Sequence, residues 1–126
     1  MLRPSAFYSE RRPQKHSATD VQGARIEALE RILQSRPTDS RARFGLALEY
    51  ERLGRWDQVV VHLREYLSVT DDEGNAYGRL GRALLTRGRQ AEARDAYHHG
   101  IEAARRHHHP TMAAEFEDAL ADIGED

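Results

Sequence analysis

The sequence predicts an all-α protein in which antiparallel helix pairs are repeated in tandem. Gly54 and Gly88 stand 34 residues apart, and each follows a stretch with the apolar spacing of a helix. Leu46 and Leu80 repeat at the same distance, as do Tyr50 and Leu84, Val59 and Ala93, Leu63 and Tyr97, and Leu67 and Ile101. Charged residues make up 32% of the 126 residues, against nine glycines and four prolines, which favours a soluble helical chain.

Residues 1–19 are expected to form a flexible basic tail. Pro4 and Pro13 prevent one continuous helix. The charged residues of the tail are Arg3, Glu10, Arg11, Arg12 and Lys15, which give it a net charge of +3. An alternative is that Phe7 and Tyr8 anchor the tail on this protein or on a neighbour.

The first helix is predicted at residues 20–36. Thr19 and Gln22 have the spacing of a capping box. A single apolar stripe is formed by Ile26, Leu29, Ile32 and Leu33. Pro37 ends the helix, so residues 20–37 look like the second half of a repeat whose first half is missing.

Two helix pairs follow, predicted at residues 40–53 with 56–69 and at residues 73–87 with 90–106. Asp39 or Ser40 caps the first of these helices, and Thr70 with Glu73 forms another capping-box spacing. Gly81 costs about 1 kcal/mol of helix propensity relative to alanine. We therefore expect it to allow the close approach of a neighbouring helix.

A last helix is predicted at residues 111–123, after an interruption of the repeat pattern at residues 107–110. Its apolar stripe consists of Met112, Phe116, Leu120 and Ile123, and its other faces are acidic. A helix with one apolar stripe and a charged outer face can close the end of an open stack.

Residues 41–72 and 75–106 resemble tetratricopeptide repeats. The matching residues are Leu46, Ala47, Tyr50, Gly54, Trp56, Val59, Leu63 and Leu67 in the first copy, and Tyr77, Leu80, Gly81, Leu84, Gly88, Ala93, Tyr97 and Ile101 in the second. The resemblance implies a short right-handed α-α superhelix. It places repeats at residues 40–73 and 74–107, after the half-repeat and before a capping helix at 110–124, in one domain of residues 20–126.

The resemblance also implies a concave groove lined by the first helix of each pair. The residues it places there are Arg41, Phe44, Leu48, Glu51 and Arg52, followed by Asn75, Gly78, Arg82, Leu85 and Thr86. This groove suits an extended or helical peptide with an apolar anchor and acidic neighbours. One subclass of the family clamps the C-terminal carboxylate of chaperone tails, but Phe44 and Leu48 stand where that clamp would begin, so we do not expect this activity. Alternatively, the N-terminal segment covers these two side chains.

No catalytic constellation is present, so we expect neither enzyme activity nor a cofactor. The sequence has no cysteine, no G-x-S-x-G motif and no glycine-rich phosphate loop after a strand. Seven histidines invite a metal hypothesis, but no two have the i, i+4 spacing that a ligand pair on one helix face needs. His98 with Glu102 is the nearest pair. Consecutive histidines such as His107–His109 point about 100° apart in a helix, so we expect no metal site.

Composition also bears on location and partners. No apolar run approaches the ~18 residues of a transmembrane helix, and the N-terminus lacks the apolar core of a secretory signal. We expect a cytoplasmic protein without a membrane partner. The net charge is −2 and residues 111–126 carry six carboxylates without Lys or Arg, which argues against nucleic acid. Lys15 is the only lysine, which we interpret as the bias of a GC-rich, bacterial-like genome.

The resulting hypothesis is a non-catalytic protein–protein interaction module, an adaptor or scaffold that binds a peptide or a partner protein in its groove. Two alternatives stay open. The chain could be an assembly subunit permanently docked in a larger complex. It could also be a metal- or RNA-binding accessory protein that uses His107–His109 or the basic cluster of Arg79, Arg82, Arg87, Arg89 and Arg94. The open ends of the array would allow a homo-oligomer.

Overall fold

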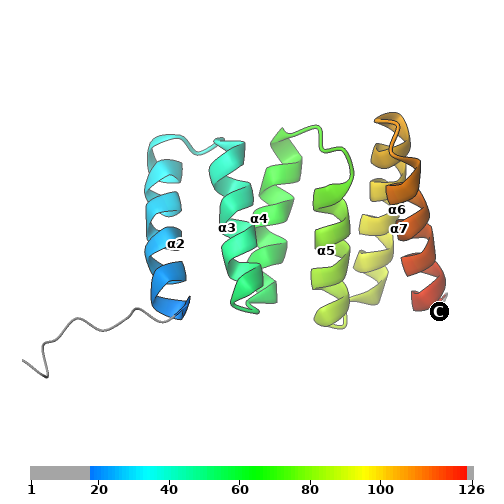
Figure 1. The fold of residues 1–126 in the computed structure, drawn as a ribbon, viewed down its shortest axis with the longest axis horizontal. Coiled ribbons are helices and arrows are strands. Elements are labelled where there is room, and N and C mark those ends of the chain that lie inside the picture. The colour runs from blue at the N-terminus through cyan, green and yellow to red at the C-terminus, as the bar shows by residue number, and fades with distance from the viewer. Residues whose placement is uncertain (1–17, 125–126) are drawn as a thin grey trace, which may run out of the picture.

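The computed structural model describes residues 18–124, and over that range it contains six α-helices and no strand (Figure 1). The helices are α2 (Ala18–Ser35), α3 (Ser40–Arg52), α4 (Trp56–Val69), α5 (Asn75–Thr86), α6 (Gln90–Arg106) and α7 (Pro110–Ile123). The predicted all-α helical repeat is confirmed. Most of the expected basic tail, including the proposed anchor of Phe7 and Tyr8, lies outside the described residues. None of the described helices is both long enough and apolar enough to cross a membrane.

The helix boundaries lie close to those predicted, and α4 and α6 match them at both ends. The capping box predicted at Thr19 and Gln22 is wrong, because α2 already begins at Ala18 and Thr19 lies inside the helix. Gln22 is buried instead. α7 begins at Pro110, one residue earlier than the pattern predicted, because proline suits the first position of a helix.

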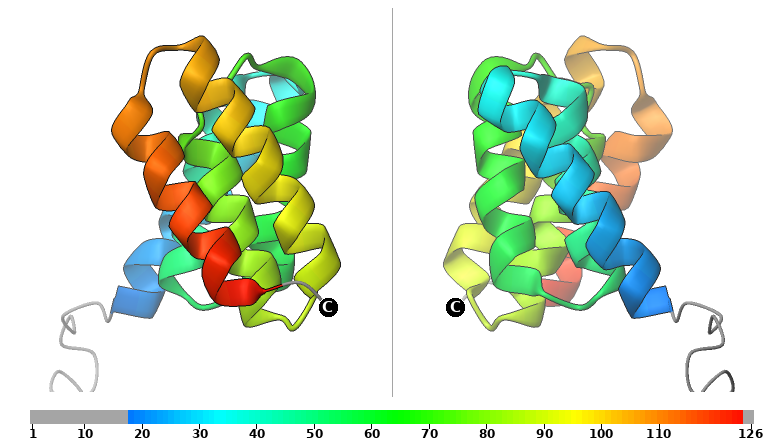
Figure 2. Two further views of the ribbon diagram at one scale, coloured as in Figure 1. Left: turned by 90° about the vertical axis from the view of Figure 1, so that its right-hand side faces the viewer. Right: turned by 90° about the vertical axis from the view of Figure 1, so that its left-hand side faces the viewer.

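The helices stand side by side in a row, with α2 at one end and α7 at the other (Figure 1). Ion pairs show which helices share a side of this row. Arg79 and Arg82 of α5 both bond to Glu51 of α3, whereas Arg64 of α4 bonds to Glu92 of α6 at 2.7 Å. We call the side of α3 and α5 the inner face and that of α4 and α6 the outer face. α7 stands next to α5 and completes the inner face (Figure 2).

The turns within the two helix pairs have the same geometry. Gly54 between α3 and α4 has φ 71°, and Gly88 between α5 and α6 has φ 75°. In both turns the residue after the glycine donates its N–H to a carbonyl in the last turn of the preceding helix, at 2.9 and 2.8 Å. Glycine suits both positions because a left-handed residue ends each helix. The sequence repeat is therefore also a repeat of backbone structure.

The connection between α6 and α7 repeats this turn without a glycine. His108 has φ 64°, and the N–H of His109 donates to a carbonyl in the last turn of α6 at 2.7 Å. The predicted interruption of the repeat pattern after α6 is therefore wrong for the backbone. Histidine is one of the few residue types other than glycine that is enriched in this conformation. The side chains on either side are held by carboxylates, His107 at 3.1 Å from Asp71 and His109 at 2.6 Å from Glu73.

The start of α5 is capped by Asp72, not by the predicted capping box at Thr70 and Glu73. The Asp72 carboxylate accepts the backbone N–H groups of Gly74 at 2.8 Å and of Ala76 at 2.9 Å. Thr70 follows α4 in an extended conformation, with φ −132° and ψ 135°, so its hydroxyl stands too early in the chain to reach the new helix. A carboxylate that satisfies two buried N–H groups is the stronger cap.

Asp72→Ala is expected to lower the free energy of unfolding by about 2 kcal/mol, the upper end of the range for helix caps. Two N–H groups would lose their acceptor, and Tyr66 would lose its hydrogen bond to the same carboxylate. Burial first, and then the charge of Asp72 and this hydrogen bond, raise the pKa of Tyr66. Urea unfolding measures the loss. The neighbouring Asp71→Ala is the control, since Asp71 is exposed and should matter much less; equal losses would contradict the capping role.

The main core lies between α3, α4, α5 and α6, where Leu46, Leu63 and Leu84 are fully buried. A second cluster of Ile101, Ala104 and Ala113 holds α7 on α6. The expected close approach at Gly81 is present, because a β-carbon added there would lie 2.7 Å from the ring of Tyr97 on α6. The core thus fixes α5 and α6 tightly enough to hold the inner face in one shape.

Candidate functional site

The inner face is held together by a shared carboxylate. Glu51 of α3 accepts hydrogen bonds from both Arg79 and Arg82 of α5, at 3.2 Å for Arg82. Only 14% of the Glu51 side chain is exposed, so the pairs are partly shielded from solvent. Two guanidinium groups around one carboxylate fix the spacing of α3 and α5 and leave one positive charge in excess.

The structure places the predicted groove residues at different depths. Those exposed to solvent are Arg41, Arg52, Asn75 and Arg82, and those half-buried are Phe44, Leu48, Glu51 and Leu85. Phe44 packs against the main core, with its ring centroid 5.0 Å from that of Tyr66. Leu85 packs against the same core. Phe44 and Leu85 are therefore engaged within the fold, and the exposed members of the predicted groove are charged or polar. Two of these already have a carboxylate partner, Arg52 with Glu49 at 2.7 Å and Arg82 with Glu51 at 3.2 Å.

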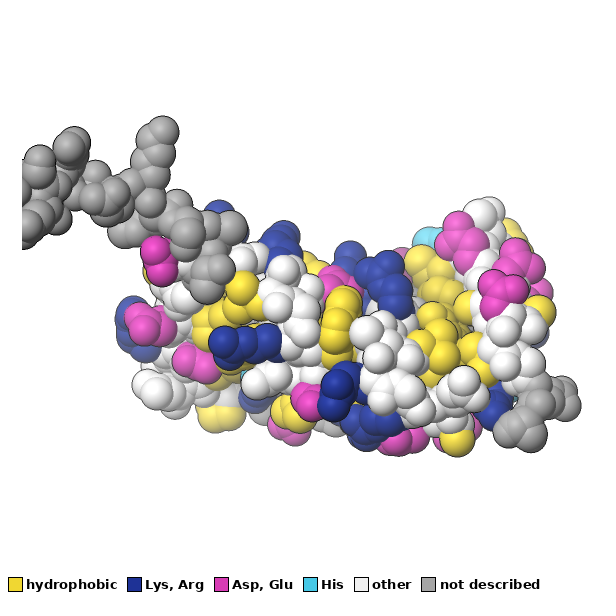
Figure 3. Space-filling model, turned by 90° about the horizontal axis from the view of Figure 1, so that it is seen from below, with side chains coloured by type: hydrophobic (Ala, Val, Ile, Leu, Met, Phe, Trp, Pro, Cys, Tyr) yellow, Lys and Arg dark blue, Asp and Glu magenta, His cyan; other side chains and the backbone are white. Residues whose placement is uncertain are grey.

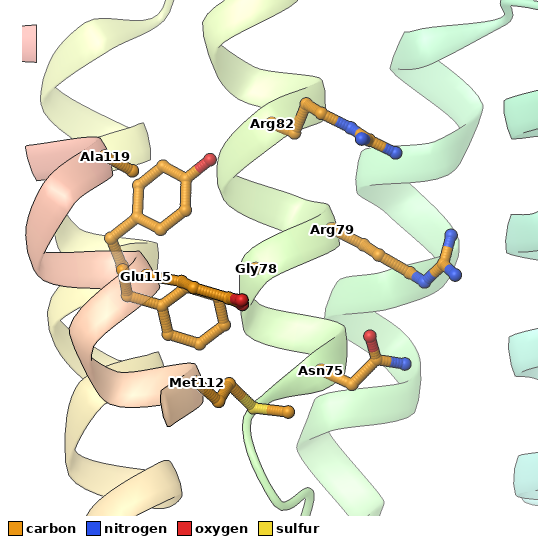
Figure 4. Close-up of a pocket in the computed structure, with 9 residues that line it drawn as sticks. Asn75, Gly78, Arg79, Arg82, Met112, Glu115 and Ala119 are labelled. Atoms are coloured by element: carbon orange, nitrogen blue, oxygen red, sulfur yellow. The ribbon is translucent and has the colours of Figure 1, made fainter. Parts of the chain in front are cut away.

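A cavity of about 350 Å³ opens on the inner face between α5 and α7 (Figure 4). Its lining residues are Asn75, Gly78, Arg79 and Arg82 of α5, Tyr97 of α6, and Met112, Glu115, Phe116 and Ala119 of α7. In the close-up, Arg79 and Arg82 extend away from α7. Of the ten residues that the sequence placed in the groove, Asn75, Gly78 and Arg82 line this cavity.

The floor of the cavity is aromatic and closely packed. The rings of Tyr97 and Phe116 lie 5.7 Å apart at 53°. Gly78 and Gly100 let the Phe116 ring lie directly on the backbone, since a β-carbon would lie 2.5 Å from the ring at Gly78 and 2.9 Å at Gly100. Burial raises the pKa of Tyr97. This floor is therefore preformed and would not have to move to receive a side chain.

The contribution of α7 to the site was not predicted, because its single apolar stripe and acidic faces indicated a helix that only closes the stack. The signal was present in the repeat period. Met112 stands 34 residues after Gly78, and Phe116 stands 34 residues after Arg82. Both are groove positions in the second repeat, so one further step of the period would have placed α7 on the inner face.

The basic cluster of the second repeat is divided between faces and paired with carboxylates. Arg82 bonds Glu51 on the inner face, whereas Arg87 bonds Asp57 at 2.9 Å. On the outer face Glu92 accepts from Arg89 and Arg64, which lower its pKa to about 2. The arginines therefore do not form one continuous basic surface of the kind that tracks a nucleic-acid backbone.

The histidines after α6 contact carboxylates of the α4–α5 connection. Asp71 accepts from Arg106 at 3.0 Å and pairs with His107, and these two contacts lower its pKa. His109 pairs separately with Glu73. Within residues 18–124, no three histidine, aspartate or glutamate side chains are grouped as metal ligands would be. The arrangement ties the α6–α7 turn to the α4–α5 connection.

Comparison with known proteins bears on this helical array in two ways. No family model matches the chain. Over 86 residues, which is 68% of the chain, it is 33% identical to small glutamine-rich tetratricopeptide repeat-containing protein 2 of Mycosarcoma maydis. The aligned part is 24% of that relative, so the chain spans about a quarter of its length.

Proposed function

Because the chain belongs to the tetratricopeptide-repeat proteins, we propose that it is a non-catalytic interaction module whose inner face binds a peptide segment of a partner protein. The cavity between α5 and α7 is the observation that carries this proposal. It joins an aromatic floor to a charged rim, which is the composition of a site for one anchoring side chain and its polar neighbours.

The part of the inner face formed by α3 and α5 would bind the peptide residues that lie on one side of the anchoring side chain. Arg41 and Arg52 of α3 are exposed, and Arg82 lies at the edge of the cavity. An extended or helical segment with acidic residues could meet these arginines while its apolar side chain fills the cavity. An adaptor of this kind needs no catalytic group. A cytoplasmic location and self-association through the ends of the array stay predictions.

Selection of peptides from a random display library against the full chain tests the proposal. Affinities of the selected peptides are then measured by fluorescence anisotropy. Arg82→Glu should weaken their binding about fivefold or more, since an attraction at the rim becomes a repulsion. Arg87→Glu is the matched control, because it makes the same charge change on an arginine that also has a carboxylate partner but lies outside the cavity.

Circular dichroism and urea unfolding confirm that both variants fold. If no peptide is selected, or if the two substitutions weaken binding equally, the inner face is not the binding surface. An affinity that Arg82→Glu leaves unchanged would also show that the inner face is not the binding surface.

A further inference from the structure

The two walls of the cavity carry opposite charges. On the α5 wall, Arg79 and Arg82 share the single carboxylate of Glu51, so one positive charge is not balanced. On the α7 wall, Glu115 has no hydrogen bond or ion pair to any residue between 18 and 124. A ligand in the cavity therefore meets an excess cation on one side and, on the other, an anion without a partner in the described part of the chain.

This difference in sign extends beyond the cavity. α7 contains four carboxylates, Glu115, Glu117, Asp118 and Asp122, and no Lys or Arg. α3 and α5 together contain five arginines against two carboxylates, namely Arg41, Arg43, Arg52, Arg79 and Arg82 against Glu49 and Glu51. Seen along the helices, dark blue side chains stand in the middle of the molecule, magenta ones stand at the α7 end, and hydrophobic ones fill the hollow between them (Figure 3). The inner face thus changes from positive to negative at the cavity.

We propose that the partner is a peptide segment whose charge changes sign at its anchor. Its apolar side chain fills the cavity, an acidic residue on one side meets Arg82, and a basic residue on the other side meets Glu115. This inference rests on the proposed function and specifies the chemistry of the ligand. It adds a requirement to the acidic, apolar-anchored peptide expected from the sequence, namely a basic residue over α7.

Two physical arguments favour this pattern over a uniformly acidic peptide. A carboxylate placed over α7 would be repelled by Glu115, and like charges brought together at an interface suppress the wrong partner. A lysine or arginine there gains an ion pair with Glu115, and its aliphatic stem can lie along Met112 and the Phe116 ring. The anchor itself must be apolar, because Phe116 and Tyr97 form the floor.

The anchor has a definite size limit. The cavity measures about 350 Å³, and it is open to solvent on the inner face. Ala119 lines it and is the smallest side chain on the α7 wall, so enlarging Ala119 fills the space that the anchor would occupy. Gly78 is a poorer choice for a test, because a side chain there would also displace the Phe116 ring.

The test uses the full chain and four labelled peptides that share a central leucine. The flanking residues are acidic and basic, acidic on both sides, basic on both sides, or serine on both sides, and affinities come from fluorescence anisotropy. We expect the mixed-charge peptide to bind about fivefold more tightly than any of the others. A serine-flanked peptide that binds as tightly as the mixed one would overturn the charge requirement.

Substitutions in α7 test which side chains cause the charge preference and which space the anchor fills. Glu115→Lys should shift the preference to the peptide with acidic residues on both sides. Glu117→Lys should leave the preference unchanged, since Glu117 lies outside the cavity and pairs with Arg105. Ala119→Leu should abolish binding, whereas Ala114→Leu, an exposed position on the same helix, should not.

The outcomes separate this inference from the proposed function. If peptides taken from the random library are weakened by Arg82→Glu but are insensitive to Glu115→Lys and Ala119→Leu, the inner face binds peptides without the charge reversal. The inference would then be wrong and the proposed function would stand. If neither the library peptides nor the designed ones bind, both fail.

Discussion

Leu84→Ala should lower the free energy of unfolding by about 2–5 kcal/mol, the range for a buried leucine whose removal leaves a cavity. Leu84 has no exposed surface and lies in the main core. The four helices around it are held by their turns and ion pairs, so they can close the cavity only in part. Urea unfolding followed by circular dichroism measures the loss.

The position of Leu84 gives this substitution a second consequence. α5 stands in the middle of the row, and helices of the array pack on their neighbours in sequence. In a stack with such nearest-neighbour contacts, weakening the centre separates the two ends. We therefore expect a smaller dependence of the unfolding free energy on urea than in the unchanged chain, because the ends would unfold in separate steps.

Leu85→Ala is the matched control for Leu84→Ala. The two leucines are adjacent in α5, but Leu85 is only half-buried, so its loss should be clearly smaller. Equal losses would mean that the core does not lie where the burial places it. A larger loss at Leu85 would require that α5 be rotated about its axis.

The fold could be predicted from the sequence because its signals are local and repeated. Gly54 and Gly88 each end a helix with positive φ, and the apolar residues between them follow the period of a helix. The helix-ending glycine and the apolar period both depend only on the backbone conformation within a few residues. For that reason α4 and α6, which follow these glycine turns, were predicted with the correct ends.

Two errors concern the connections between helices. Asp72 replaces the predicted capping box through local hydrogen bonds, from N–H groups two and four residues ahead of it, and its buried carboxylate also interacts with Tyr66. His108 takes a left-handed conformation in a turn whose adjacent histidines pair with carboxylates from the α4–α5 connection. The spacing of Thr70 and Glu73 did not show which side chain would cap α5, and no local pattern shows the contacts between the two connections at the histidine turn.

For the candidate site, too, some features could be predicted from the sequence and others could not. Exposure of Arg41, Arg52, Asn75 and Arg82 follows from their spacing along α3 and α5. The spacing could not show that Glu51 is already shared by two arginines, because that depends on the distance between two helices. It also could not show that Glu115 lines the cavity without a partner among residues 18–124, and this side chain sets the charge of the ligand we propose.

Gly81→Leu should cost about 3 kcal/mol of unfolding free energy or more, because a larger side chain has no room at this position. A β-carbon alone would lie 2.7 Å from the Tyr97 ring, and Tyr97 is itself buried between α5 and the α7 end of the core. Leucine is a better helix former than glycine by roughly 0.8 kcal/mol, so any net loss comes from packing and not from helix propensity.

Gly23→Leu is the control that separates the packing cost from the gain in helix propensity. Gly23 lies within α2, and apart from its chain neighbours and the nearby backbone of α2 no described atom lies within 4 Å of a β-carbon built there. The same substitution should therefore leave stability unchanged or raise it by up to about 1 kcal/mol. Urea unfolding measures both substitutions. A loss of unfolding free energy at Gly81 together with a gain at Gly23 would show that α5 and α6 are in contact at Gly81. Stabilisation at both sites would mean that the two helices stand further apart, and the cavity floor formed by Tyr97 would then not be preformed.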